Sequence, residues 1–110
     1  MEELGRFTIA PDHPALPGHF PGNPVVPGVV VLDEAAVLVA QAVGAGMPTV
    51  AGLPKVKFVG VVRPGQEVCV LGAPGSRGER WRFECRVAGA AVATGEMELT
   101  DAGDGAATAP

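Results

Sequence analysis

The chain has 110 residues, the length of a single domain. Its 16 glycines and 11 prolines make up about a quarter of it, a fraction at which low-complexity disorder has to be considered. However, 47% of the residues are hydrophobic and only 18% are charged, the opposite of a disordered chain, so we expect one folded domain over residues 1–100. The formal net charge of −4 excludes the basic field that nucleic-acid binding requires.

The sequence also predicts a cytoplasmic protein without a membrane span. Residues 1–4 are acidic and lack the basic and apolar regions of a signal peptide. The apolar stretch Val25–Val43 carries Asp33 and Glu34 near its middle, and two charges there make insertion into a bilayer costly. The two cysteines form no metal or redox motif, and we expect no metal site.

A short strand is expected at residues 4–10, followed by a stiff loop. Residues 11–28 hold nine glycines and prolines. Proline fixes its own φ angle and biases the preceding residue toward extended conformations, so this loop has a defined shape. Rigid loops of this kind are where binding and catalytic groups concentrate.

Residues 29–43 fit either a strand or a helix. The many valines favour a strand, whereas fifteen residues without a breaker and an alanine-rich second half favour a helix. Pro27 is tolerated at a helix start, and Gly44 can cap the end. We therefore predict a helix, and because it is apolar nearly all round we expect it to be buried and surrounded by the rest of the chain.

Four strands are expected after the helix, at residues 55–62, 67–71, 79–87 and 91–99. The third alternates most clearly, with basic and acidic side chains on one face and Trp81, Phe83 and Cys85 on the other. Tight turns between consecutive strands predict an antiparallel meander, and hence an α+β fold. Residues 101–110 have no large apolar side chain and are expected to be a disordered tail.

Few side chains are candidates for chemistry. His19 is fixed between prolines and glycines in residues 17–22, while Asp33 and Glu34 lie in an otherwise apolar helix. Desolvation raises the pKa of a carboxyl and lowers that of a histidine, which brings both toward neutrality. Such a pair can act as general acid and base.

These residues resemble a known family. Residues 18–33, GHFPGNPVVPGVVVLD, are similar to the HFPGxPxxPGxxxx(E/D) motif of the 3-hydroxyacyl-[acyl-carrier-protein] dehydratases of the hotdog fold. The spacing of 14 from His19 to Asp33 matches that motif. A weaker match runs from Lys57-Phe58 to residues 63–65, and the resemblance covers about residues 5–99. It implies an antiparallel sheet wrapped around one central helix.

The resemblance implies a role for each matching residue. His19 would take the α-proton of a 3-hydroxyacyl thioester, and Asp33 would assist the departure of the 3-hydroxyl as water. In the family the acid comes from the other subunit, which implies a homodimer with a shared site. No cofactor is implied, because a thioester already acidifies the α-carbon. The implied substrate contacts are the N–H of Gly28, together with Val29, Phe20 and Phe58.

Some assignments stay open at this point. Many family members carry Glu followed by Ala at the acidic position, whereas this chain has Asp33 followed by Glu34. Glu34 points about 100° away around the helix, so Asp33 is our choice for the acid. His13 reads as a turn residue. The basic side chains Arg80, Arg82 and Arg86 form either a solvated strand face or, with Lys55 or Lys57, a docking surface for an acidic acyl carrier protein.

The predicted function is therefore dehydration of a 3-hydroxyacyl thioester carried on acyl carrier protein. A hotdog thioesterase is the leading enzymatic alternative, since it needs a carboxylate aimed at a water rather than a fixed histidine. A non-catalytic acyl-binding subunit with the same fold is the third.

Overall fold

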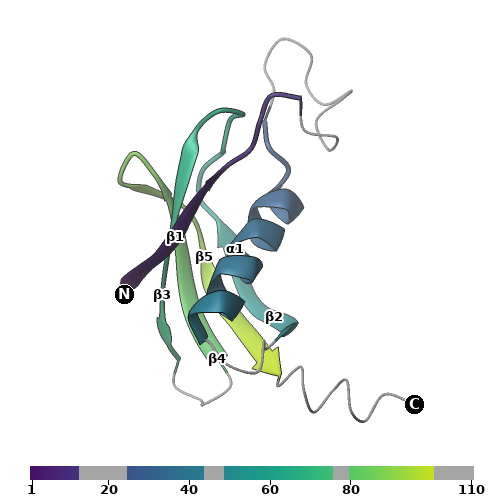
Figure 1. Ribbon diagram of the computed structural model, residues 1–110, viewed down its shortest axis with the longest axis vertical. Helices are drawn as coiled ribbons and strands as arrows, with labels where there is room; N and C mark the ends of the chain where they lie inside the picture. Colours follow the sequence, from purple (N-terminus) through teal and green to yellow (C-terminus); the bar gives the residue numbers. More distant parts are fainter. Residues whose placement is uncertain (13–24, 44–48, 76–79, 101–110) are drawn as a thin grey trace, which may run out of the picture.

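The computed structural model describes residues 1–12, 25–43, 49–75 and 80–100, which form one antiparallel sheet and one helix. Figure 1 shows the helix lying across one face of the curved sheet. The strand order across the sheet is β1-β3-β4-β5-β2. This arrangement confirms the predicted α+β fold. The elements are β1 (Glu2–Thr8), α1 (Gly28–Val43), β2 (Thr49–Phe58), β3 (Glu67–Pro74), β4 (Arg80–Val87) and β5 (Ala90–Thr100).

The helix prediction for the valine-rich segment is confirmed. The carbonyl of Pro27 accepts hydrogen bonds from the N–H groups of Val30 (3.0 Å) and Val31 (3.4 Å), which closes the first turn. Proline thus stands at the helix start, where its missing N–H costs nothing.

The expectation that α1 is buried all round is wrong for the single chain. Its buried side chains form one stripe, Val31, Ala35 and Val39, at intervals of four residues. On the opposite side Val29 is 64% exposed and Val37 is 54% exposed. A helix packed against one sheet can bury only the stripe that faces the sheet, and no described element covers the other side.

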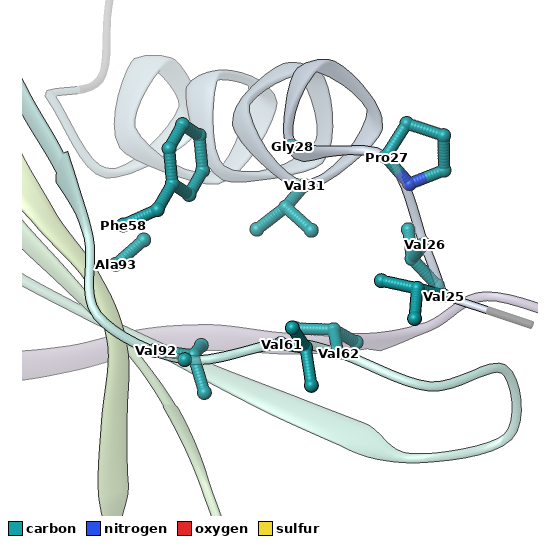
Figure 2. Close-up of a pocket in the computed structure, with 11 residues that line it drawn as sticks. Val25, Val26, Pro27, Gly28, Val31, Phe58, Val61, Val62, Val92 and Ala93 are labelled. Atoms are coloured by element: carbon teal, nitrogen blue, oxygen red, sulfur yellow. The ribbon is translucent and has the colours of Figure 1, made fainter.

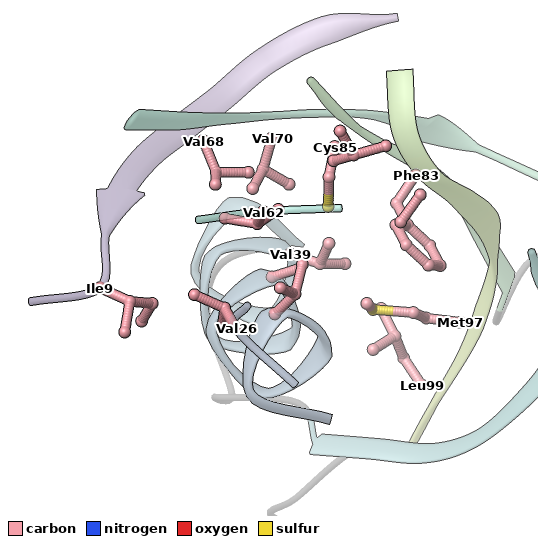
Figure 3. Packing of buried hydrophobic residues seen from close by; sticks show 14 residues of the cluster. Ile9, Val26, Val39, Val62, Val68, Val70, Phe83, Cys85, Met97 and Leu99 are labelled. Atoms are coloured by element: carbon pink, nitrogen blue, oxygen red, sulfur yellow. The ribbon is translucent and has the colours of Figure 1, made fainter. Parts of the chain in front are cut away.

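The buried stripe packs against the concave face of the sheet, as Figure 3 shows. β3 and β4 supply alternate side chains to this core because successive residues of a strand point to opposite faces. Phe83 and Cys85 are fully buried, whereas Arg82 and Arg86 on the other face are exposed, which confirms the predicted alternation in β4. The largest fully buried side chains are Phe83, Met97, Val39, Val68, Val70 and Cys85.

The predicted four-stranded meander is wrong at its first strand. Only β3, β4 and β5 are consecutive neighbours, while β2 pairs with β5 at the far edge of the sheet. β2 also begins and ends earlier than the predicted residues 55–62. Gly52 and Pro54 resemble a turn in the sequence, but they lie inside β2, where the ladder register shifts between Val50 and Lys55.

The segment between β2 and β3 runs across the end of the helix rather than forming a hairpin. The N–H of Val26 bonds to the carbonyl of Val62 (2.7 Å), and the N–H of Gly65 bonds to the carbonyl of Ile9 (2.8 Å). Gly65 has φ +88° in a turn closed by the Gln66 N–H and the Arg63 carbonyl, a conformation that favours glycine. The predicted turn is therefore present, and it leads the chain from the edge strand β2 to β3, between β1 and β4.

Two predicted segments lie outside the described residues. These are most of the stiff loop, residues 13–24, and the tail, residues 101–110. In the part of the chain that is described, no helix is long and apolar enough to cross a membrane.

Candidate active site

A cavity of about 460 Å³ lies between the N-terminal turn of α1 and the sheet. Figure 2 shows side chains from three separate segments around it. Among the described residues, no charged side chain lines it, so it suits an apolar ligand. Its lining residues are Val25, Val26, Pro27, Gly28, Val31, Phe58, Gly60, Val61, Val62, Val92 and Ala93.

Two of the predicted substrate-binding residues, Gly28 and Phe58, meet at this cavity. A Cβ atom at Gly28 would lie 2.6 Å from Cζ of Phe58, closer than real Cβ contacts allow. The aromatic ring therefore occupies space that any side chain at position 28 would need. The absence of a side chain at Gly28 is what allows Phe58 to form one wall of the cavity.

The same end of α1 offers hydrogen-bond donors to a ligand. The first N–H groups of a helix have no partner within the helix, and the helix dipole places partial positive charge there. In the described residues no hydrogen bond is donated by the N–H of Gly28 or Val29, whereas those of Val30 and Val31 bond to Pro27. An apolar cavity beside free N–H groups can bind an acyl chain and stabilise a carbonyl oxygen that gains negative charge.

The acidic candidates lie on another side of the helix. Asp33 and Glu34 are both exposed, and neither lines the cavity. Successive helical residues are rotated by about 100°, so Asp33 and Val29 share the face that points away from the sheet. Within one chain, Asp33 and Val29 are therefore separated from the cavity by the body of the helix.

The structure does not describe the histidine-bearing loop. His13, His19 and Phe20 fall within residues 13–24, outside the described residues. The described residues resume at Val25, which itself lines the cavity. The described chain from Val25 onward, six positions after the predicted catalytic histidine, therefore forms part of the cavity wall.

The arginines of β4 lie on the convex face of the sheet among glutamates. Arg80 is 3.6 Å from a carboxylate oxygen of Glu96 and 3.6 Å from one of Glu98. Arg86 pairs with Glu84. Among the three predicted docking residues, Arg82 makes no ion pair in the described part of the chain, although Glu96 is its register partner on β5. The face carries charges of both signs rather than a positive stripe.

The thiol groups lie on opposite faces of the sheet. Burial raises the pKa of the Cys85 thiol to about 12 on the concave face. Burial also raises the pKa of Cys69 on the other face, where the nearby carboxylate of Glu3 adds to the effect. Neither thiol is therefore activated as a nucleophile. No cluster of His, Cys, Asp and Glu that could hold a metal ion occurs in the described ranges.

Sequence reasoning missed most of the cavity lining. The segment after Phe58, Val59-Gly60-Val61-Val62, was predicted as the end of an alternating strand. The only sign in the sequence that it does not alternate is its unbroken run of apolar residues. Nothing in the sequence marks Val92 and Ala93 as lining residues, because their place in the cavity wall depends on a register shift in β5.

The chain matches the family model described as "ApeI-like: ApeI dehydratase" over residues 3–96. Relatives carry the name 3-hydroxyacyl-[acyl-carrier-protein] dehydratase FabZ. The protein from Caldicellulosiruptor bescii is 33% identical over 103 residues, covering 84% of this chain and 73% of that protein. The one from Dichelobacter nodosus is 33% identical, covering 91% and 77%. The match to the relative from Caldicellulosiruptor saccharolyticus, 38% identical, spans only about half of that protein, 51%.

Solved structures share the fold at low sequence identity. The dehydratase heterocomplex ApeI:P from Xenorhabdus doucetiae superposes with a TM-score of 0.69 at 22% identity, covering 86% of this chain and 82% of that one. The fluoroacetyl-CoA-specific thioesterase FlK, in complex with fluoroacetate and CoA, gives 0.66 at 15% identity, covering 94% and 92%. These likenesses show a hotdog fold. The family match over residues 3–96 shows more, and the chain belongs to the ApeI-like dehydratase family.

Proposed function

We propose that this protein dehydrates a 3-hydroxyacyl thioester, carried on acyl carrier protein, to the trans-2-enoyl thioester. The family match supports the reaction type. The observation that carries the proposal is the apolar cavity beside the free N–H groups at the start of α1. An acyl chain can lie in that cavity while its thioester carbonyl accepts a hydrogen bond from Gly28.

The proposed reaction uses one base and one acid. His19 takes the proton from the α-carbon, and the electron pair of that C–H bond forms the new C=C bond. The bond from the β-carbon to the hydroxyl oxygen breaks, and Asp33 donates the proton with which the hydroxyl leaves as water. The positive end of the helix dipole stabilises the charge that develops on the thioester oxygen. A proton then returns from the histidine to the carboxylate, which restores both groups.

The exposed side of α1 supports a site shared between two copies of the chain. Along one flank of this side, residues recur at alternating intervals of four and three, the spacing of a seam between two packed helices. A second copy packed there would cover this seam and bring its own Asp33 toward the cavity of the first. This outward seam consists of Val29, Asp33, Ala36, Ala40 and Val43, of which Val29, Asp33 and Val43 are exposed, while Ala36 and Ala40 are half-buried and Ala36 also touches the core.

We also propose that the carrier protein docks at Arg80, Arg82 and Arg86. Because Arg80 and Arg86 are paired with glutamates, Arg82 is the arginine of this set whose charge is available to an acidic partner. We expect Arg82→Glu to raise KM for the carrier-bound substrate while leaving kcat for a pantetheine thioester unchanged. A cytoplasmic location likewise stays a prediction.

One assay separates the candidate functions. The purified protein is given a 3-hydroxyacyl thioester, and the products are followed by mass spectrometry and a thiol reagent. Loss of water with the thioester intact supports the dehydratase, and His19→Ala should lower the rate by about 10²–10⁴-fold. Release of free thiol identifies a thioesterase. Binding without turnover identifies a non-catalytic subunit, and a His19→Ala rate close to that of the native chain contradicts the proposed base.

A further inference from the structure

The cavity beside α1 has an exposed mouth and a buried floor. At the mouth Phe58 is 50% exposed and Val61 is 55% exposed. The floor consists of side chains that are at most 7% exposed, namely Val26, Val31, Val62, Val92 and Ala93. A ligand that enters at the mouth therefore ends against these five residues.

A β-bulge in β5 builds one side of this floor. Cys85 is the register partner of Ala93, but the next residue of β4, Arg86, is the partner of Ala91, so Val92 is the extra residue. A bulge of this kind re-aims side chains that would otherwise alternate between the two faces. It explains how both Val92 and Ala93 line the cavity although they are adjacent in a strand.

The connection after β2 holds this bulge in place. The carbonyl of Val92 accepts hydrogen bonds from the N–H groups of both Val59 (2.9 Å) and Gly60 (3.2 Å). The floor is thus fixed by backbone hydrogen bonds from the segment that also supplies the mouth. Its depth is then set by the size of the side chains on it rather than by movement of the strand.

Ala93 is the one floor residue without a branched side chain. It is fully buried, and its register partners are Phe58 on β2 and Cys85 on β4. Cys85 is itself fully buried, so the floor at Ala93 is closed to solvent on that side. The space that a longer side chain at position 93 would fill is therefore available to the ligand.

We infer that Ala93 sets the length of the acyl chain that the site accepts. This inference rests on the proposed function, because it takes the ligand of the cavity to be the acyl group of the substrate. Hydrophobic pockets discriminate substrates that differ by a single methylene by roughly 10-fold or more. A branched side chain on the floor should therefore exclude the end of the longest chains and leave short chains unaffected.

The test compares three variants on a series of 3-hydroxyacyl pantetheine thioesters from butyryl to dodecanoyl. Ala93→Val adds two methyl groups to the floor, and we expect kcat/KM for the longest accepted chain to fall by about 10-fold or more relative to butyryl. Ala93→Gly enlarges the floor and should move the ratio the other way. Ala35→Val is the matched control, because Ala35 is equally buried on the sheet-facing side of α1 but does not line the cavity.

The outcomes separate the two proposals. If the native chain dehydrates none of the thioesters, the proposed function fails. If it dehydrates them and the chain-length ratio stays the same in both Ala93 variants, or changes as much in Ala35→Val, the assignment of Ala93 is wrong. Calorimetric binding of unreactive acyl-pantetheine amides gives the same comparison without turnover, and opposite shifts in the valine and glycine variants cannot arise from loss of folding.

Discussion

Asp33 is a charged side chain on an apolar face of α1. Val29 and Val37, one turn to either side, are both more than half exposed, and the sheet-facing stripe lies on the other side of the helix. Glu34 is exposed as well, but its direction differs by about 100°. When a second copy covers the outward seam, Asp33 is therefore enclosed by the interface, whereas Glu34 points away from it.

The two carboxylates can be told apart by neutral replacements. We expect Asp33→Asn to lower kcat by about 10²–10⁴-fold, because the amide cannot donate a proton to the leaving hydroxyl. Glu34→Gln, which removes the neighbouring charge in the same helical turn, should change kcat by only a few-fold. Steady-state kinetics with one 3-hydroxyacyl thioester measures both. The reverse pattern assigns the acid to Glu34 and contradicts our choice.

Cys85 predicts a loss of stability in alkali. Its folded pKa is raised to about 12 by burial, against an ordinary value of 9.0. Below pH 9 both states keep the proton and the full stability is present; above pH 9 the unfolded state loses its proton first, so stability falls as the pH rises toward 12. Between pH 9 and 10 this group should cost about 1 kcal/mol.

Urea unfolding at pH 8, 9 and 10 measures that loss. In Cys85→Ala the decrease between pH 9 and 10 should be smaller than in the native chain by about 1 kcal/mol, whatever the replacement costs at pH 8. Cys69→Ala is the comparison variant: burial also raises the pKa of that half-buried thiol, so it measures how much of the loss comes from the other face of the sheet. Equal pH dependence in all three proteins would show that the Cys85 thiol does not titrate in this way.

The elements differ in how far local sequence determines them. β4 was predicted well because its alternation reflects burial on one face, which a strand carries in its own residues. β2 was predicted in the wrong place because its pairing with β5 depends on residues 35 to 51 positions away. The cavity was beyond sequence reasoning for the same reason. Gly28 and Phe58 were both identified through the motif, but their contact depends on the fold.

In the hairpin between β4 and β5, Ala88 has a backbone conformation that alanine disfavours. Val87 and Ala90 are register partners, and the two residues between them, Ala88 (φ 51°) and Gly89 (φ 83°), both have positive φ. This mirror-image turn matches the twist of the strands and favours Asn-Gly. Alanine in the left-handed region is held there at a cost, because its Cβ crowds the following carbonyl.

Replacing Ala88 by asparagine should therefore stabilise the protein. We expect Ala88→Asn to raise the free energy of unfolding by about 0.5–1 kcal/mol, because asparagine tolerates positive φ. Chemical denaturation at neutral pH measures the change. Ala90→Asn, an exposed position beside the turn but within β5, should bring no gain. A loss of stability in Ala88→Asn would contradict the expected relief.

The whole molecule presents two unlike surfaces. The convex face of the sheet carries paired charges, such as Arg80 with Glu96 and Arg6 with Glu67. The side of α1 and its neighbouring segment instead expose large apolar side chains. A contiguous exposed apolar surface marks an interaction site. These apolar residues include Val29, Val37, Val43, Leu53, Phe58, Val59 and Val61.

If a second copy covers that surface, thermal stability depends on protein concentration. We expect the melting temperature to rise by about 3 °C for each tenfold increase in concentration, because folding is then coupled to association. Ala40→Arg places a charge on the outward seam and should abolish this dependence, with a monomer in light scattering. Gln41→Arg, at the next residue, which is exposed where Ala40 is half-buried, should retain it. A native chain whose melting temperature is constant over this range would argue against the shared site.

The extra residue in β5 also makes the floor of the cavity sensitive to the number of residues in the strand. On the turn side of Val92, the pairs Val87 with Ala90 and Arg86 with Ala91 follow one register; beyond it, from Cys85 with Ala93 onward, the register is shifted by one. Deleting Val92 would join the two registers into a single regular ladder. The carbonyl that accepts hydrogen bonds from the N–H groups of both Val59 and Gly60 would be lost. A one-residue deletion there would leave the hairpin and sheet able to form but would remove the part of the cavity floor that Val92 builds, a route by which a hotdog chain can change its ligand without losing its fold.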